Sequence, residues 1–275
     1  GAENSYPFMR KVYDNRKKAD GSPDIEFHSL RSTPNEPDAT DDLFLSTKTS
    51  KLDPRVILEL KNHIEEQNTD VVYASSLRAQ LFSVLVKSVY KPSLDIFARV
   101  TGRLFRDDQW YEFLLRRLQF RIDYFVAPSK ASQKKLIDIG VMEQNTVVHY
   151  NFLDPNDFNP DKYISEEEKD RVGISGDPVV GFVGRLIDLK NVDVILKGFN
   201  QLLADHPDAI LVIVGDGPLR PELEQLTREL GIEGSVHFMG YRSDVPEIIS
   251  TLDIGILISE YESFGMPIIE FLSMG

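Results

Sequence analysis

Short apolar segments alternate with amphipathic helical segments along most of this sequence. The apolar segments predict strands at 70–74, 124–129, 146–151, 178–183, 209–214, 236–241 and 253–258. Apolar residues that recur at helical spacing predict helices at 54–67, 77–90, 130–139, 193–204, 222–230 and 245–251. Strands that alternate with helices in this way form parallel sheets covered by helices, so the sequence predicts an α/β fold.

An irregular segment with two prolines, 152–160, divides the chain. The 275 residues are enough for two domains that each bury a core. We therefore predict a first domain at 1–153 and a second domain at 154–275. Residues 31–51 are rich in Pro, Asp, Ser and Thr, and we expect them to form a surface loop.

Composition excludes several classes of protein. The chain has no cysteines, which excludes disulfides and thiolate metal sites, and its five histidines show no ligand spacing. The formal net charge of −13 argues against nonspecific binding to nucleic acid. Because no run of eighteen apolar residues and no signal-peptide pattern occurs, we expect a soluble cytoplasmic protein.

The last seventeen residues read as a glycine loop that leads from the strand at 253–258 into a helix, whose start is marked by Pro267. The first N–H groups of a helix are free, and the positive end of the helix dipole lies behind them, so they suit a phosphate group. The expected donors are the N–H groups of Phe264, Gly265 and Met266.

Two carboxylates flank this loop. Glu262 lies before it and Glu270 lies eight positions later, near the start of the helix. One carboxylate is placed to accept hydrogen bonds from sugar hydroxyls and the other from a ribose. Carboxylates near a helix start also serve as caps or surface charges, so this spacing alone leaves both interpretations open.

A second set of charges follows the strand at 178–183. Gly184 makes a turn, and Arg185 and Lys190 come next, five positions apart, before the helix at 193–204. Such a pair suits a diphosphate, because arginine binds it with two hydrogen bonds and lysine adds a point charge.

Together these motifs resemble those of the retaining, nucleotide-sugar-dependent glycosyltransferases of family four, also called glycosyl transferases group 1. The resemblance rests on the two glutamates around Phe264-Gly265, on the Gly-Arg-x-x-x-x-Lys pattern, and on the order of the motifs in the second domain. It implies the GT-B fold, in which two Rossmann-like domains with parallel sheets face each other across a cleft.

The resemblance also implies a role for each candidate residue. Glu262 would contact the donor sugar and act in catalysis, and Glu270 would hold the ribose. Arg185 and Lys190 would clamp the donor phosphates, and the Gly215-Asp216-Gly217 turn would face the donor. The other donor-binding residues would be Gly1, Gly184, Gly240, Ser263, Phe264, Gly265 and Met266.

Both ends of the chain depart from the family pattern. Gly1-Ala2-Glu3 resembles a loop that follows the first strand in the family, and a helix at 8–16 and a strand at 24–30 are expected after it. Family members continue beyond the position that corresponds to Gly275. We therefore expect a chain truncated at both ends, with the first strand missing and the second domain incomplete. The histidine that many members carry in the first domain has no counterpart at 93–102.

The segment 96–135 differs in charge from the rest of the chain. It holds nine Lys and Arg against four Asp and Glu, and aromatic residues are interleaved with these charges. One interpretation is a basic amphipathic surface that meets an anionic membrane, which would place the protein at the inner face of the membrane, or that binds a lipid-linked acceptor. The other interpretation is two packed helices with solvated arginines.

The function that the resemblance implies is transfer of a hexose from a UDP-, GDP- or ADP-sugar to an acceptor, with retention of configuration and without a metal or other cofactor. The acceptor would be a glycan, a lipid-linked sugar or a small molecule. Two alternatives stay open: a noncatalytic or regulatory nucleotide-binding fragment, and a nucleotide-sugar epimerase or phosphorylase of the same fold.

Overall fold

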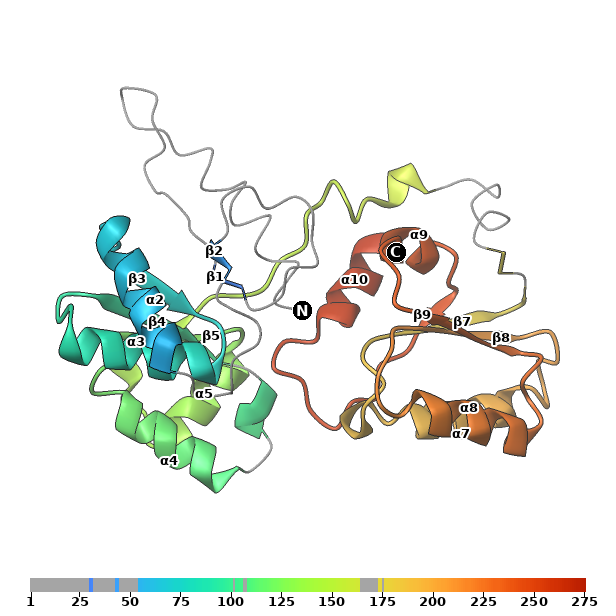
Figure 1. The fold of residues 1–275 in the computed structure, drawn as a ribbon. Coiled ribbons are helices and arrows are strands. Elements are labelled where there is room, and N and C mark those ends of the chain that lie inside the picture. Colours follow the sequence, from blue (N-terminus) through green and yellow to red (C-terminus); the bar gives the residue numbers. More distant parts are fainter. Residues whose placement is uncertain are drawn as a thin grey trace. The chain divides into compact units, whose positions relative to one another are not determined.

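The computed structural model describes residues 30–31, 43–44, 54–100, 102–105, 108–163, 173–174 and 176–275. The chain divides into two compact units, Gly1–Asn151 and Phe152–Gly275, whereas the sequence prediction places the boundary after Leu153. Each unit holds a four-stranded parallel sheet (Figure 1), which confirms the predicted α/β class. The helix predicted at 8–16 lies outside the described residues, as do most of the strand at 24–30 and of the loop at 31–51.

The sheet of the first unit has the strand order β3-β4-β5-β6. Its strands are β3 (Val71–Ala74), β4 (Asp95–Arg99), β5 (Tyr124–Ala127) and β6 (Thr146–Val148). Its helices are α2 (Pro54–Glu66), α3 (Leu77–Val89), α4 (Gln109–Leu118) and α5 (Lys130–Asp138). A separate pair of two-residue strands, β1 (Leu30–Arg31) and β2 (Leu43–Phe44), is also parallel.

Three of these helices begin at residues that cap them. The side chains of Ser76, Asp108 and Ser129 accept hydrogen bonds from N–H groups three residues further on, at 3.0 to 3.2 Å. Each cap satisfies one of the donors that a helix start leaves free. The starts of α3, α4 and α5 are therefore fixed by local sequence.

Strand β4 corrects the sequence prediction, which placed no strand between residues 74 and 124. Ile96 and Ala98 are fully buried, whereas Asp95 is exposed and Phe97 and Arg99 are half-buried. The charged residues at both ends of this five-residue strand hide its apolar alternation in the sequence. Its position between β3 and β5 makes it an interior strand of the sheet.

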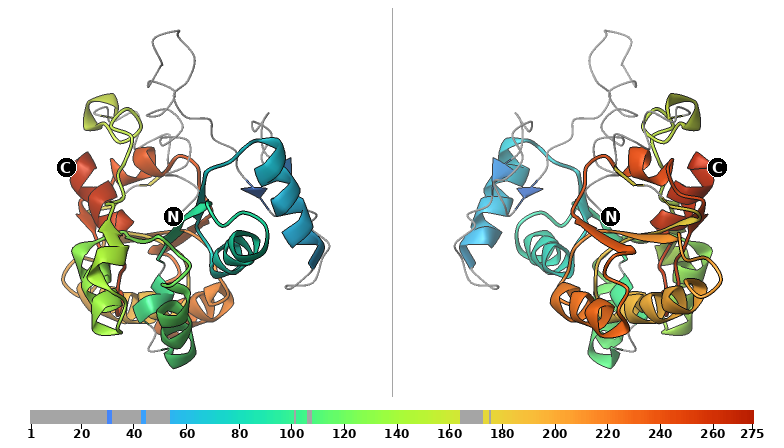
Figure 2. Two further views of the ribbon diagram at one scale, coloured as in Figure 1. Left: turned by 90° about the vertical axis from the view of Figure 1, so that its left-hand side faces the viewer. Right: turned by 90° about the vertical axis from the view of Figure 1, so that its right-hand side faces the viewer.

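The sheet of the second unit has the order β10-β7-β8-β9. Its strands are β7 (Val179–Val183), β8 (Ile210–Val214), β9 (Val236–Gly240) and β10 (Ile254–Gly255), and its helices are α7 (Val192–Leu202), α8 (Arg220–Leu230), α9 (Val245–Ile249) and α10 (Met266–Met274). Helices α7 and α8 cover one face of the sheet and α9 and α10 lie on the other (Figures 1 and 2). Alternate residues of β8 serve the two faces: Leu211 and Ile213 pack with α7 and α8, and Val212 and Val214 pack with α9.

Strand β10 is shorter and more exposed than the buried strand predicted at 253–258. It has two residues, pairs with β7 on one side, and leaves Ile254 49% exposed. Among the described residues β10 is the edge of the sheet, so its outer side receives no neighbour. Within the part of the chain that the structure describes, no helix has the length and apolar character needed to cross a membrane.

Candidate functional site

The predicted donor-site residues of the second unit follow the carboxyl ends of strands in one sheet. Gly184 and Arg185 come after β7, Gly240 ends β9, and the loop after β10 leads into α10. Because the strands are parallel, these ends meet at a single edge, where open α/β sheets bind ligands. Gly1 lies outside the described residues.

Two of the predicted residues, Lys190 and Glu262, form an ion pair. Lys190 ends a short 3-10 turn, Asp188–Lys190, and its Nζ donates a hydrogen bond to Oε1 of Glu262. The lysine side chain is 13% exposed and the glutamate side chain 27%. The contact joins the Gly-Arg-x-x-x-x-Lys motif after β7 to the paired-glutamate motif after β10.

Two further hydrogen bonds hold these loops together. Asn191 Nδ2 donates to the carbonyl of Ile258 at 3.1 Å, and the Glu260 N–H donates to the carbonyl of Leu189 at 2.9 Å. Asn191 has a left-handed conformation, with φ 49°, which asparagine adopts more readily than most residues. Sequence reasoning missed Asn191, although an asparagine between a lysine and a helix start is the signal for such a turn.

The arginines near the carboxyl ends of these strands differ in whether they form ion pairs. Arg220 pairs with Glu224 at 2.8 Å, and Arg242 pairs with Asp244. The hydrogen bond from Arg242 lowers the pKa of Asp244 below its ordinary value. Arg185 is exposed and has no ion-pair partner among the described residues, so its guanidinium is available to an incoming anion.

The start of α10 offers free backbone donors. Gly265, with φ 80°, precedes the helix and no side chain caps it. Pro267 has no N–H, and the Ile268 N–H already donates to the carbonyl of Gly265 at 3.0 Å. In the described structure the N–H groups of Gly265 and Met266 have no hydrogen-bond partner, so they suit an anion.

Three more candidates lie near this helix start. Ser263 and Phe264 are partly buried in the loop before Gly265. Glu270 lies in the second turn of α10 and is 8% exposed. Burial raises the pKa of the Glu270 carboxyl above its ordinary value, and no described side chain forms an ion pair with it. A buried carboxylate without a partner is a candidate acceptor for ligand hydroxyls.

Two glycines that sequence analysis treated as a turn are essential to the shape of this edge. Gly215, with φ 128°, donates its N–H to the carbonyl of Gly240 at 2.8 Å. A Cβ at Gly215 would lie 1.9 Å from the carbonyl oxygen of Gly184, and one at Gly217 would lie 2.3 Å from that of Leu186. The turns after β7 and β8 therefore pack backbone against backbone, which fixes the position of Gly184.

The candidate site is thus cationic at Arg185 and Lys190 and carries free N–H groups at α10. It also holds two carboxylates, Glu262 and Glu270. Among the residues that the structure describes, no three His, Asp or Glu side chains are grouped closely enough to hold a metal ion.

Comparison with known proteins finds a family model that matches the C-terminal part of the chain. The family model "Glycosyl transferases group 1" matches residues 164–275. An alpha-D-kanosaminyltransferase from Streptomyces kanamyceticus is 34% identical over 110 residues, which are 39% of this chain and 28% of that protein. The N-acetyl-alpha-D-glucosaminyl L-malate synthase of Bacillus anthracis is 32% identical over 127 residues, 46% of this chain and 32% of that protein.

Solved structures agree with the fold. HepE from Anabaena, crystallised with UDP and glucose, superimposes with a TM-score of 0.73 at 21% identity, over 85% of this chain and 65% of HepE. The chain thus spans about a third of the length of the two curated relatives and about two thirds of HepE. Residues 164–275 thus match the family model of glycosyl transferases group 1, and the two parallel sheets agree with the GT-B fold of the solved neighbours.

Proposed function

We propose that this chain binds a nucleotide diphosphate sugar at the carboxyl edge of the second sheet and transfers its hexose to an acceptor with retention of configuration. The observation that carries the proposal is the ion pair between Lys190 and Glu262, which brings the lysine proposed to bind phosphate beside a carboxylate. One relative is named an alpha-D-kanosaminyltransferase, which supports transfer of a sugar, and HepE was solved with UDP and glucose, which supports a UDP-sugar as the donor. UDP-sugars are therefore the first donors to test.

The charges fit the reaction without a metal ion. As the bond to the donor phosphate breaks, negative charge grows on the leaving diphosphate and positive charge grows on the sugar. Arg185, Lys190 and the start of α10 are placed to stabilise the diphosphate. The Glu262 carboxylate, held beside Lys190, stabilises the sugar cation, and Glu270 accepts hydrogen bonds from the ribose.

The acceptor and the location are further parts of the proposal. The basic and aromatic composition of 96–135 supports a lipid-linked or anionic acceptor and a position at the inner face of a membrane. A cytoplasmic enzyme would meet its donor there.

The change Glu262→Gln tests the catalytic role. It removes the negative charge that stabilises the sugar cation and keeps the size of the side chain. We expect transfer from the active UDP-sugar to fall at least about 100-fold, as for loss of one electrostatic group in other active sites, while UDP binding is kept.

Glu260→Gln is the matched control, because this glutamate is exposed and lies two residues away. It should leave binding and transfer unchanged. Wild-type transfer by the Glu262→Gln variant would contradict the catalytic role. A wild-type chain that binds UDP-sugars and turns over none of them would instead favour the noncatalytic alternative.

A further inference from the structure

Helix α4 of the first unit presents large aromatic side chains to solvent. Trp110 is 58% exposed and Phe113 48%, and Phe120, two residues beyond the helix end, is 71% exposed. The opposite side of the helix is buried in the core through Tyr111, Leu115 and Leu118. The core is therefore satisfied by one face of α4, and the outward aromatic residues contribute little to it.

Three arginines accompany these aromatic residues. Arg116, Arg117 and Arg121 are exposed, and none of them forms an ion pair with a described residue. The Arg117 guanidinium lies 5.1 Å from the centre of the Phe113 ring. The aliphatic part of the Arg117 side chain therefore lies on an aromatic surface, and the guanidinium charge faces solvent. Arginines have this arrangement at membrane interfaces.

The neighbouring carboxylates do not neutralise these arginines, because they are paired with lysines. Glu112 pairs with Lys135 at 3.8 Å, and Asp138 pairs with Lys134 at 3.2 Å. Residues 109–138 contain six Lys and Arg and three Asp and Glu, a net charge of +3 in a chain of net charge −13. The uncompensated positive charge is thus local to this surface.

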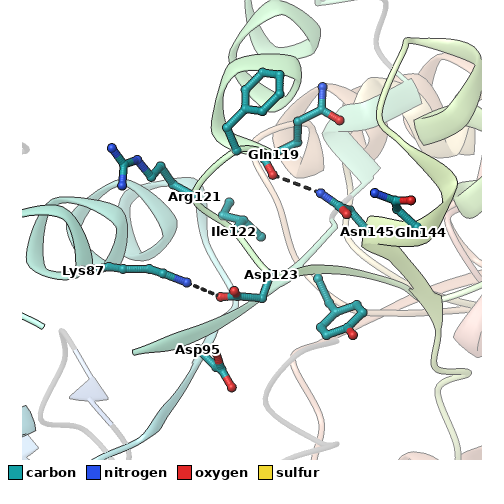
Figure 3. A pocket seen from close by; sticks show the side chains of 10 residues that line it. Lys87, Asp95, Gln119, Arg121, Ile122, Asp123, Gln144 and Asn145 are labelled. Carbon is teal, nitrogen blue, oxygen red and sulfur yellow. Dashed lines mark hydrogen bonds and ion pairs between the residues drawn. The ribbon is translucent and has the colours of Figure 1, made fainter. Parts of the chain in front are cut away.

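An adjacent hollow does not share this charge. It has a volume of about 440 Å³ and lies at the amino ends of β4 and β5 (Figure 3). Lys87 pairs with Asp123 at 2.6 Å, and Asp95 lies on the same wall without an ion pair to Arg121. The hollow is neutral overall and does not select an anion.

We propose that the α4 face, defined as Trp110, Phe113, Arg116, Arg117, Phe120 and Arg121, docks on an anionic lipid bilayer. The aromatic rings enter the region between headgroups and acyl chains, and the arginines bind lipid phosphates. Charge complementarity selects this occupant: an anionic surface attracts the α4 face and repels the rest of the chain. The proposal deepens the membrane contact proposed above and does not depend on the donor site, because docking needs no nucleotide.

The chain has one tryptophan, Trp110, and it belongs to this face, so its fluorescence reports docking directly. The 275-residue chain is mixed with vesicles of phosphatidylcholine alone or of phosphatidylcholine with phosphatidylglycerol. We expect a blue shift of the emission and co-sedimentation with the anionic vesicles, and neither with the zwitterionic ones. Added salt should reverse both effects.

Separate variants test the contributions of the arginines and of the aromatic rings of the α4 face to vesicle binding. Each basic residue at an anionic surface strengthens binding about fivefold, so Arg117→Gln with Arg121→Gln should weaken vesicle binding about 25-fold. Lys197→Gln with Arg228→Gln, two exposed basic residues of the second unit, is the matched control and should change little. Phe113→Ser with Phe120→Ser should also abolish the blue shift, whereas Val89→Ser, 66% exposed on α3, should not.

Three results would overturn the proposal. The first is no binding to anionic vesicles, and the second is binding that the arginine variant leaves unchanged. The third is a blue shift that rises with protein concentration in the absence of vesicles, because a second copy of the chain would then cover the α4 face. Loss of UDP binding would count against the donor site and would leave this proposal standing.

Discussion

At the scale of single residues, Arg185 and Lys190 have the same proposed ligand and different surroundings. Arg185 is exposed and has no ion-pair partner in the described structure, whereas Lys190 is mostly buried against Glu262. A donor diphosphate therefore adds a partner to Arg185, but it must share Lys190 with a carboxylate that is already there.

Because of this difference, we expect substitutions of the two residues to have different effects on UDP affinity and on stability. Arg185→Ala should lower UDP affinity by about 10-fold or more, since a charge-assisted hydrogen bond contributes about 1.5–3 kcal/mol, and should leave the free energy of unfolding unchanged. Lys190→Met should lower UDP affinity, because it removes a proposed phosphate ligand. It should also lower the free energy of unfolding, because it leaves the partly buried carboxylate of Glu262 unpaired. Calorimetry and urea unfolding measure the two effects.

The control for Lys190 is Lys197→Met. Lys197 pairs with Asp193 at 2.9 Å on the surface of α7, and both side chains are about half exposed. An exposed pair of this kind contributes at most about 0.5 kcal/mol. If Lys197→Met and Lys190→Met had equal effects on UDP affinity, Lys190 would have no special role.

We expect the buried carboxylate of Glu270 to lower the stability of the chain at neutral pH while it contributes to UDP binding. Because burial raises the pKa of Glu270 in the folded chain, the unfolded chain loses this proton first as pH rises. The folded chain then binds more protons than the unfolded chain, so this group lowers stability as pH rises from the ordinary glutamate value of 4.5 through the folded-state pKa.

Glu270→Gln removes this titration. We expect the variant to have a higher free energy of unfolding than the wild type at neutral pH, a similar one at a pH below the ordinary glutamate range, and weaker UDP binding. Glu233→Gln, at an exposed glutamate of the same unit, is the control. A variant that is less stable at neutral pH, or that binds UDP normally, would refute the role of Glu270.

At the scale of elements, the turn after β8 depends on a residue without a side chain. Gly215→Ala would place a Cβ 1.9 Å from the carbonyl oxygen of Gly184 and force alanine to φ 128°. We expect destabilisation of at least about 1–3 kcal/mol from the backbone conformation alone, with reduced UDP binding because the turn after β7 must move. Urea unfolding and calorimetry check both.

Gly198→Ala provides a control of opposite sign. Gly198 lies inside α7, and an added Cβ would meet no atom within 4 Å. Alanine should therefore stabilise the chain by about 0.5–1 kcal/mol. Equal effects of the two substitutions would show that the packing of the two turns does not matter.

The elements also show what sequence could and could not predict. Long periodic helices such as α2 and buried strands such as β8 were predicted within a few residues, because their own side chains determine their faces. Strand β4 was missed because its charged ends hide a short alternation, and β10 was predicted as buried although it is an exposed edge. Burial of an edge depends on neighbours that the local sequence does not reveal.

The same distinction applies to the candidate site. Arg185, Lys190, Glu262 and Glu270 were identified from motif spacing. The ion pair between Lys190 and Glu262 was not, because it joins residues 72 positions apart. It follows from the strand order, which places β7 next to β10.

At the scale of the whole molecule, the two units carry separate features. The described residues of the donor site belong to the second unit, as does the stretch matched by the family model, and the α4 face belongs to the first unit. Each unit has its own hydrophobic core. Substitutions in the α4 face should therefore leave nucleotide affinity unchanged, and substitutions at Arg185 or Lys190 should leave vesicle binding unchanged.

The central claim is that the second unit binds the diphosphate of a nucleotide sugar through Arg185 and Lys190. Calorimetric titration of UDP, GDP and ADP into the 275-residue chain, with and without magnesium, tests it most directly, with the double variant Arg185→Ala and Lys190→Met titrated in parallel. We predict binding of UDP that magnesium does not alter and that the double variant loses. Absence of binding by all three nucleotides, or equal binding by the wild type and the double variant, would contradict the claim.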